Sequence, residues 1–182
     1  MTPINVSRFT LACLMVLALS ACGFHLRSKI ALPADLGPVR VTSTTPYSPL
    51  ADSLADGLEN AGAVAASADA KDVATLQVLS ERWGDLPIAI DAQGRAQEFS
   101  LRYAAVFVFR RADGSELVPQ QVVELSRDYV SPPQNVTGTS TEREVIANEL
   151  RREMAASILR RVDGVIQGGM IQGDAQGKSP AP

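Results

Sequence analysis

Hydrophobic and polar residues recur along this chain in patterns that predict a small set of helices and strands. Residues 38–42 (PVRVT) predict a β-strand. Ser48 and Pro49 then favour a helix start, because serine is a good N-cap and proline suits the first helical position. Gly62 favours the end of this helix, while Gly57 inside it counts slightly against a helix. The leucines of the segment recur every fourth residue and predict one buried stripe: Leu50, Leu54 and Leu58.

The middle of the chain alternates between apolar and polar residues, which predicts strands. Residues 72–83 alternate in part, and Asp91–Gly94 supply a turn. The clearest alternation follows, with one apolar, largely aromatic face: Phe99, Leu101, Tyr103, Ala105, Phe107 and Phe109. The opposite face is mixed: Glu98, Ser100, Arg102, Val106, Val108 and Arg110. A long strand with one core-facing side fits this period of two.

A further strand is predicted at residues 117–130 after a hairpin turn at Asp113-Gly114. Val123 and Leu125 are its expected inward residues. Pro119 cannot donate to a strand ladder, so we expect an edge or a bulge there.

A second helix is predicted after a loop at residues 131–138. Thr141 and Glu144 have capping-box spacing. The apolar stripe that follows is Ile146, Leu150, Met154 and Ile158, extended by Val162. Gly164 favours the end of this helix, and the Gly-, Gln- and Ser-containing segment at residues 166–182 is expected to be a disordered tail.

These elements predict an α/β (α+β) fold that is a two-layer sandwich. Each helix has one apolar stripe and the sheet has one strongly apolar face, so burial is simplest if both helices pack on that face. The last three strands follow one another through hairpins and are therefore antiparallel. The first strand reaches the sheet through a helix, which makes one parallel pair possible.

The N-terminus predicts a targeting segment rather than part of the fold. Arg8 precedes the apolar run Phe9–Leu19, which is too short for a bilayer span of roughly twenty residues. The sequence Leu19-Ser20-Ala21-Cys22 resembles the lipobox of bacterial lipoproteins. This resemblance implies a signal peptide at residues 1–21 and a diacylglycerol and an N-acyl chain on Cys22. Gly23, in place of an aspartate, implies the outer membrane, facing the periplasm. An ordinary secretory signal with an incidental cysteine is the alternative.

Composition narrows the function further. The chain has 17 basic and 20 acidic residues, and nothing in this balance indicates a nucleic-acid partner. Residues 22–165 are long enough for one domain with its own core. Cys13 would leave with the signal and Cys22 would carry lipid, so no disulfide is expected in the mature chain.

The sequence contains few residues of the types that catalysis or metal binding requires. His25 is the single histidine and lies beside the expected anchor, which argues against Ser-His and Cys-His catalysis. No His/Cys pattern predicts a metal site or a cofactor. Acids that are distant in sequence remain possible partners for carboxylate catalysis, but Glu142 and Glu144 fit better as charges near a helix N-terminus.

The residues after the expected anchor resemble a known family. Residues 22–27 (CGFHLR), followed by Leu32-Pro33, are similar to the mature N-terminus of the lipopolysaccharide-assembly lipoprotein (LptE) family. Residues 91–110 resemble that family's hairpin, and residues 149–162 resemble its terminal helix. Ser28 stands where many members carry glycine. The resemblance implies a fold of two helices on a four-stranded sheet.

The resemblance also implies a function without catalysis. Members sit in the lumen of the outer-membrane β-barrel LptD, help it assemble, and help deliver lipopolysaccharide to the outer leaflet. Because arginine binds phosphates and carboxylates well, the candidate lipopolysaccharide ligands are Arg95, Arg102, Arg110 and Arg111. Each is also a plausible ordinary surface arginine, and the family's basic contact positions fall here on Asp91-Ala92 and Thr139.

Two other functions stay open at this point. A free-standing periplasmic lipoprotein that binds an envelope ligand would have a cavity between helices and sheet. An envelope hydrolase that uses carboxylates would have a pH-dependent activity that one Asp or Glu substitution abolishes.

Overall fold

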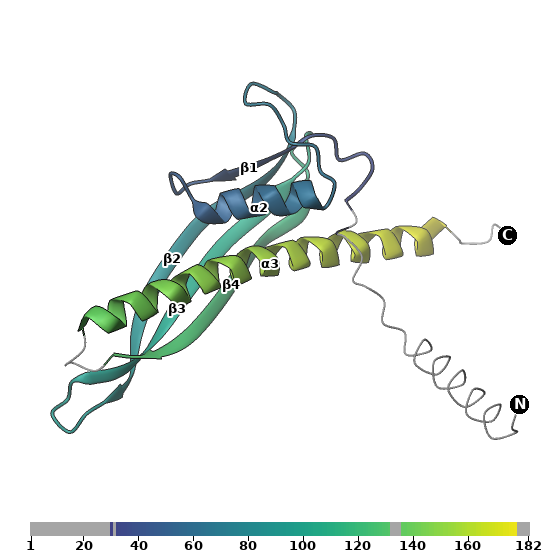
Figure 1. Ribbon diagram of the computed structural model, residues 1–182. Helices are drawn as coiled ribbons and strands as arrows, with labels where there is room; N and C mark the ends of the chain where they lie inside the picture. Colours follow the sequence, from purple (N-terminus) through teal and green to yellow (C-terminus); the bar gives the residue numbers. More distant parts are fainter. Residues whose placement is uncertain (1–29, 31, 132–135, 178–182) are drawn as a thin grey trace, which may run out of the picture.

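The computed structural model describes residue 30, residues 32–131 and residues 136–177, with side chains omitted for 136–139 and 170–177. Cys22, His25 and the expected signal peptide therefore lie outside the described residues. Figure 1 shows a long twisted sheet with both helices on one face. The elements are β1 (Val39–Ser43), α2 (Pro49–Asn60), β2 (Ala74–Ile90), β3 (Ala96–Arg110), β4 (Glu116–Val130) and α3 (Val136–Gly177). The predicted two-layer fold is confirmed.

The strands lie in the order β1-β2-β3-β4. β1 runs parallel to β2, with Val39 opposite Ala74 and Ser43 opposite Val78, and α2 lies in the connection between them. The two hairpins make β2–β3 and β3–β4 antiparallel. β1 covers only the first residues of β2, so the hairpin of β2 and β3 extends well past it (Figure 1).

Helix α2 begins as predicted. The Ser48 hydroxyl accepts a hydrogen bond from the Ala51 amide at 3.2 Å, and Pro49 is the first helical residue. The predicted leucine stripe of this helix is almost completely buried. Gly57 has a packing role, because a Cβ atom there would overlap the Cδ1 atom of Leu159 on α3. The glycine thus lets the two helices approach closely.

Helix α3 is longer than predicted at both ends. It begins at Val136, so Thr141 and Glu144 lie inside the helix and the predicted capping box is wrong. It also continues past Gly164 to Gly177, although residues 166–177 were expected to be disordered. The apolar stripe explains part of this continuation, because Ile166 follows Val162 in the buried core. No proline lies between residues 136 and 177 to stop the helix.

The predicted core face of β3 is confirmed: its residues from Leu101 to Phe109 on that face are fully buried, while Phe99 is partly buried. β4 contributes Val123 and the partly buried Leu125, as predicted, together with Val118 and Tyr129. Pro119 predicted an edge or a bulge, and both are present: β4 is an edge strand, and its register shifts beside Val118.

β2 is the strand that departs most from its prediction. It continues from Trp83 to Ile90, and its register against β3 shifts between Val78 and Ser80. Inward residues before the shift are even-numbered, such as Leu76 and Val78. Beyond it, the residues opposite the core face of β3 are odd-numbered: Glu81, Trp83 and Asp85. The helix layer therefore meets polar and aromatic side chains along this half of the sheet.

Candidate interaction surface

The uncovered face of the sheet is the main candidate for an interaction surface. Within the described residues, both helices lie on the opposite face (Figure 1). Strand pairing places Arg102 between Gly84 and Ser126, and the neighbouring Ala104 between Arg82 and Glu124. Val106 and Val122 lie opposite each other on this face, and Val122 is 56% exposed. The face is therefore mixed, with charged, small and apolar side chains side by side.

Ion pairs along β3 engage two of the four candidate arginines. Arg102 Nη1 lies 3.7 Å from Glu124 Oε1, and Arg110 Nη2 lies 3.4 Å from Glu116 Oε1. Arg110 also donates to Gln77 Oε1 at 3.3 Å. These side chains are exposed, so each pair contributes at most about 1 kcal/mol and can open to bind another anion.

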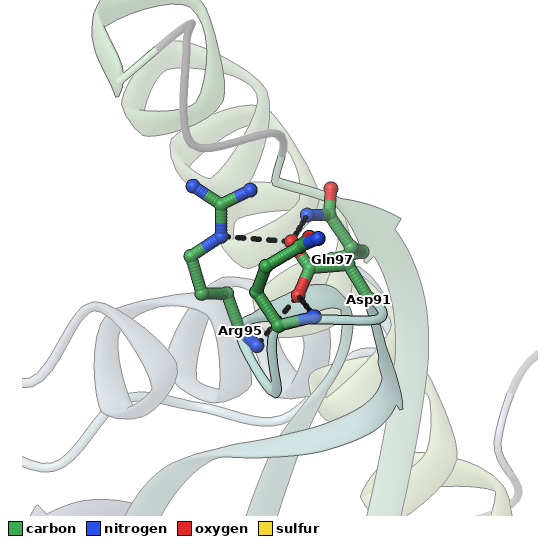
Figure 2. A network of polar contacts seen from close by, with 4 residues as sticks. Asp91, Arg95 and Gln97 are labelled. Atoms are coloured by element: carbon green, nitrogen blue, oxygen red, sulfur yellow. Dashed lines mark hydrogen bonds and ion pairs between the residues drawn. The ribbon is translucent and has the colours of Figure 1, made fainter.

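Arg95, a third candidate, lies at the turn between β2 and β3. Figure 2 shows Arg95 and Gln97 converging on the carboxylate of Asp91. The Asp91 carboxylate accepts hydrogen bonds from the Arg95 amide at 2.8 Å, from Arg95 Nε at 2.8 Å and from Gln97 Nε2 at 3.0 Å. These donors, led by the Arg95 amide, lower the pKa of Asp91. Gly94 supplies the positive φ of +77° that this turn requires.

The four candidate arginines do not form a single site. Arg95 lies at one end of β3, Arg102 near its middle and Arg110 at its other end, with Arg111 in the next turn. At about 3.3 Å per residue, Arg95 and Arg110 are on the order of 50 Å apart. A single phosphate cannot bridge them, so any ligand contacts at these positions are separate contacts.

A second feature, which the sequence did not predict, is a hydrogen-bond cluster around Glu81. Ser48 donates to Glu81 Oε1 at 2.5 Å, and the Tyr103 hydroxyl donates to Glu81 Oε2 at 2.6 Å. Ser43 adds a longer bond of 3.3 Å to Oε1. Burial, with help from the Glu81 carboxylate, raises the pKa of Tyr103. The cluster joins the end of β1, the start of α2 and the two central strands.

An aromatic stack lies next to this cluster. The rings of Trp83 and Tyr103 are 3.9 Å apart between centroids and nearly parallel. The guanidinium carbon of Arg151, on α3, lies 5.2 Å from the centroid of the Trp83 ring. A cation over an aromatic face is stabilising, so α3 is held to this half of the sheet by aromatic contacts as well as by apolar ones.

A third cluster joins the far end of the sheet to the start of α3. Arg143 donates to both carboxylate oxygens of Asp85, and the Tyr129 hydroxyl donates to Asp85 Oδ1 at 2.9 Å. The Arg143 hydrogen bond is the main reason that the pKa of Asp85 is lowered. Burial is the main reason that the pKa of Tyr129 is raised. Because Asp85, Arg143 and Tyr129 are hydrogen-bonded to one another, we assign this cluster a structural role.

Over the described ranges, no group of three or more His, Cys, Asp or Glu side chains is placed to hold a metal ion. Across the same part of the chain, no helix has the length and hydropathy needed to cross a bilayer.

A comparison with protein families decides the class of this chain. The family model described as "LptE: Lipopolysaccharide-assembly" matches residues 36–162, which is more than half of the sequence. The chain belongs to the LptE family. The matched range contains β1, α2, the other three strands and α3 as far as Val162. The LptE family consists of non-enzymatic lipoproteins, and the prediction that this chain is not an enzyme is confirmed.

Known LptE proteins are similar over most of their length. The LPS-assembly lipoprotein LptE of Photorhabdus laumondii is 28% identical over 149 residues, which is 82% of this chain and 81% of that protein. The protein of the same name from Yersinia pestis is 29% identical over 153 residues, covering 82% of this chain and 72% of that protein. The chain is thus similar to LPS-assembly lipoproteins over most of its length.

Solved structures share this LptE fold. The lipoprotein B of Nitrosomonas europaea superimposes with a TM-score of 0.65 at 20% identity, over 82% of this chain and 96% of that one. The rare lipoprotein B of Shewanella oneidensis gives 0.56 at 21% identity, over 79% and 100%. At these identities the structures support the architecture of two helices on a four-stranded sheet.

Proposed function

We propose that this LptE-family protein is anchored by lipid on Cys22 at the periplasmic face of the outer membrane. There it plugs the lumen of the LptD β-barrel, helps the barrel assemble, and assists lipopolysaccharide delivery to the outer leaflet. The observation that carries this proposal is the uncovered sheet face, which combines Arg102, Glu124 and other polar side chains with exposed Val122. The lumen of an outer-membrane barrel is polar, so a plug needs a mixed surface of this kind.

The shape of the chain supports a plug. Helix α3 has 42 residues and would measure about 60 Å at 1.5 Å per residue. Strands β3 and β4 pack against this helix (Figure 1). Such a rod is longer than the bilayer hydrocarbon core, which is about 30 Å thick. A body of this length can fill a barrel from its periplasmic opening.

The lipid anchor supports the proposal in a different way. Several acyl chains on Cys22 would hold the protein at the membrane, where one chain would do so only marginally. Tethering raises the effective concentration of the plug at the barrel and favours binding without any new contact.

For lipopolysaccharide, we propose contacts by the arginines along β3 and its turns. Arg95 is 55% exposed at the hairpin tip, and Arg102 is 52% exposed on the uncovered face. Both have carboxylate partners, so a phosphate of the glycolipid would exchange with Asp91 or Glu124. Such an exchange replaces one charge-assisted hydrogen bond with another.

The test is affinity purification of the tagged, lipidated protein from outer membranes, followed by mass spectrometry of the proteins retained and of the N-terminal peptide. We expect the LptD barrel in comparable amount, and a diacylglycerol-modified, N-acylated Cys22. A Cys22→Ser variant is the matched control and should lose the lipid and most of the retained barrel. Recovery of the lipidated protein without a barrel would instead favour the free-standing, ligand-binding lipoprotein.

A further inference from the structure

An open groove of about 490 Å³ lies at the end of the molecule that follows the expected anchor. It forms where residues 33–35, the turn between β3 and β4, and the C-terminal half of α3 meet. Its lining is mostly apolar or small, with two charged side chains: Pro33, Ala34, Leu117, Val165, Ile166 and Gly169, with Asp35 and Arg111. This volume lies in the range of small-molecule and cofactor pockets.

Arg111 differs from the other three candidate arginines in forming no ion pair within the described residues. Arg95, Arg102 and Arg110 each form an ion pair with a carboxylate. Over the residues that the structure describes, the Arg111 side chain forms neither a hydrogen bond nor an ion pair. Hydrogen bonding to Ser115, helped by the charge of Arg111, lowers the pKa of the nearby Asp113, but the hydrogen bond that the Asp113 carboxylate accepts comes from the Ser115 amide, at 2.8 Å. Arg111 is therefore a cation with free donors on the wall of an apolar groove.

Asp35 gives the groove an opposite charge that Arg111 does not neutralise. Both residues line the groove, yet in the described part of the chain they do not form an ion pair with each other. One cation and one anion, kept apart beside an apolar surface, are complementary to a headgroup with a phosphate and an ammonium on the same molecule. The apolar lining suits a hydrocarbon chain attached to that headgroup.

We propose that this groove binds a phospholipid of the phosphoethanolamine type, with one acyl chain against Leu117, Val165 and Ile166. Its phosphate accepts hydrogen bonds from Arg111, and its ammonium donates to Asp35. The inference rests on the proposed function in one respect, the lipid anchor on Cys22. The eight residue-to-residue steps from Cys22 to Ile30 span at most about 28 Å when extended, which keeps this end of the molecule near a bilayer surface.

The test is photo-crosslinking of the purified, lipidated full-length protein in neutral detergent with a phosphatidylethanolamine that carries a diazirine in one acyl chain. We expect crosslinks on the peptides that contain Leu117 or residues 165–169, and competition by unlabelled phosphatidylethanolamine. Arg111→Gln should reduce labelling about tenfold, which corresponds to about 1.4 kcal/mol. Asp35→Asn should reduce it by a smaller factor of about three to five, because this substitution removes only the charge of the single carboxylate that contacts the ammonium.

Arg127→Gln is the matched control, because Arg127 is paired with Glu153, does not line the groove and is not a candidate lipopolysaccharide ligand. Its labelling should stay within about twofold of the wild-type protein. Equal labelling of the Arg111→Gln variant, or crosslinks that map outside the groove, would overturn the proposal. Equal competition by phosphatidylglycerol, which lacks the ammonium, would overturn the role of Asp35. The assay contains no barrel, so its outcome is independent of whether LptD is the partner.

Discussion

Arg143 binds Asp85 through two parallel hydrogen bonds, from Nε to Oδ1 at 2.9 Å and from Nη2 to Oδ2 at 2.7 Å. The two residues are 58 positions apart in the chain. They join the first turns of α3 to the outer half of the β2–β3 hairpin. This half of the molecule extends beyond α2 (Figure 1), so its two layers are held together by contacts of α3, including this one.

Replacing Arg143 with glutamine should destabilise the protein modestly. The pair is bidentate but partly exposed, so we expect a loss of about 1 kcal/mol in the free energy of unfolding. Chemical denaturation followed by circular dichroism measures this change. Arg152→Gln on the same helix is the control, because Arg152 has no ion pair among the described residues, and it should change stability by less than about 0.5 kcal/mol. Equal effects of the two variants would contradict the role of Arg143.

The same pair should give a pH dependence with a defined sign. The pKa of Asp85 in the folded protein lies below its ordinary value of 3.8. The unfolded chain therefore binds a proton first as the pH falls, and the stabilisation is complete only above about pH 4. The difference in unfolding free energy between wild type and Asp85→Asn should be constant near neutral pH and should shrink as the pH falls below about 4. A difference that grows on acidification would contradict this assignment.

The cluster around Glu81 should contribute more, because one of its donors is fully buried. Tyr103→Phe removes the hydroxyl that donates to Glu81 Oε2 and keeps the ring that stacks on Trp83. We expect a loss of about 1–2 kcal/mol in the free energy of unfolding. Tyr47→Phe is the matched control, because Tyr47 is 99% exposed, and it should be neutral within about 0.5 kcal/mol. A neutral Tyr103→Phe variant would show that the cluster does not stabilise the fold.

The continuation of α3 past Gly164 is testable with two substitutions of opposite sign. Ile166 is only 4% exposed, so Ile166→Ala should cost about 2 kcal/mol. Gly168 has open space around the position of a Cβ atom, so Gly168→Ala should stabilise a helix by about 0.5–1 kcal/mol. Thermal unfolding of both variants measures these shifts. If residues 166–177 were disordered, as the sequence suggests, neither variant would change the melting temperature.

The fold could be predicted from the sequence because the spacing of the apolar residues marks one buried side in most elements. The leucine stripe of α2 and the aromatic face of β3 each have one unambiguous buried side. The second half of β2 could not be predicted, because a single register shift after Val78 exchanges its two faces. That exchange turns Glu81, Trp83 and Asp85 toward the helices, and no local pattern in the sequence signals it.

The candidate arginines were predicted by residue type alone, and the structure places them far apart along one strand and its turns. Their carboxylate partners come from neighbouring strands or across a turn, as with Arg102 and Glu124. Such pairs depend on strand register, which hydrophobic alternation alone does not specify across a bulge. Arg111 could not be distinguished from Arg110 before its groove was seen. The expected domain boundaries at residues 21 and 165 stay predictions.

The central claim is that the uncovered sheet face lies against the inside of a barrel, and a crosslink from that face tests it directly. A photo-crosslinking amino acid placed at Val122, which is 56% exposed on this face, should join the protein to LptD in intact cells under ultraviolet light. The same amino acid at Arg102 should do so as well. Outer membranes that contain both proteins yet yield no LptD crosslink from either position would contradict the account.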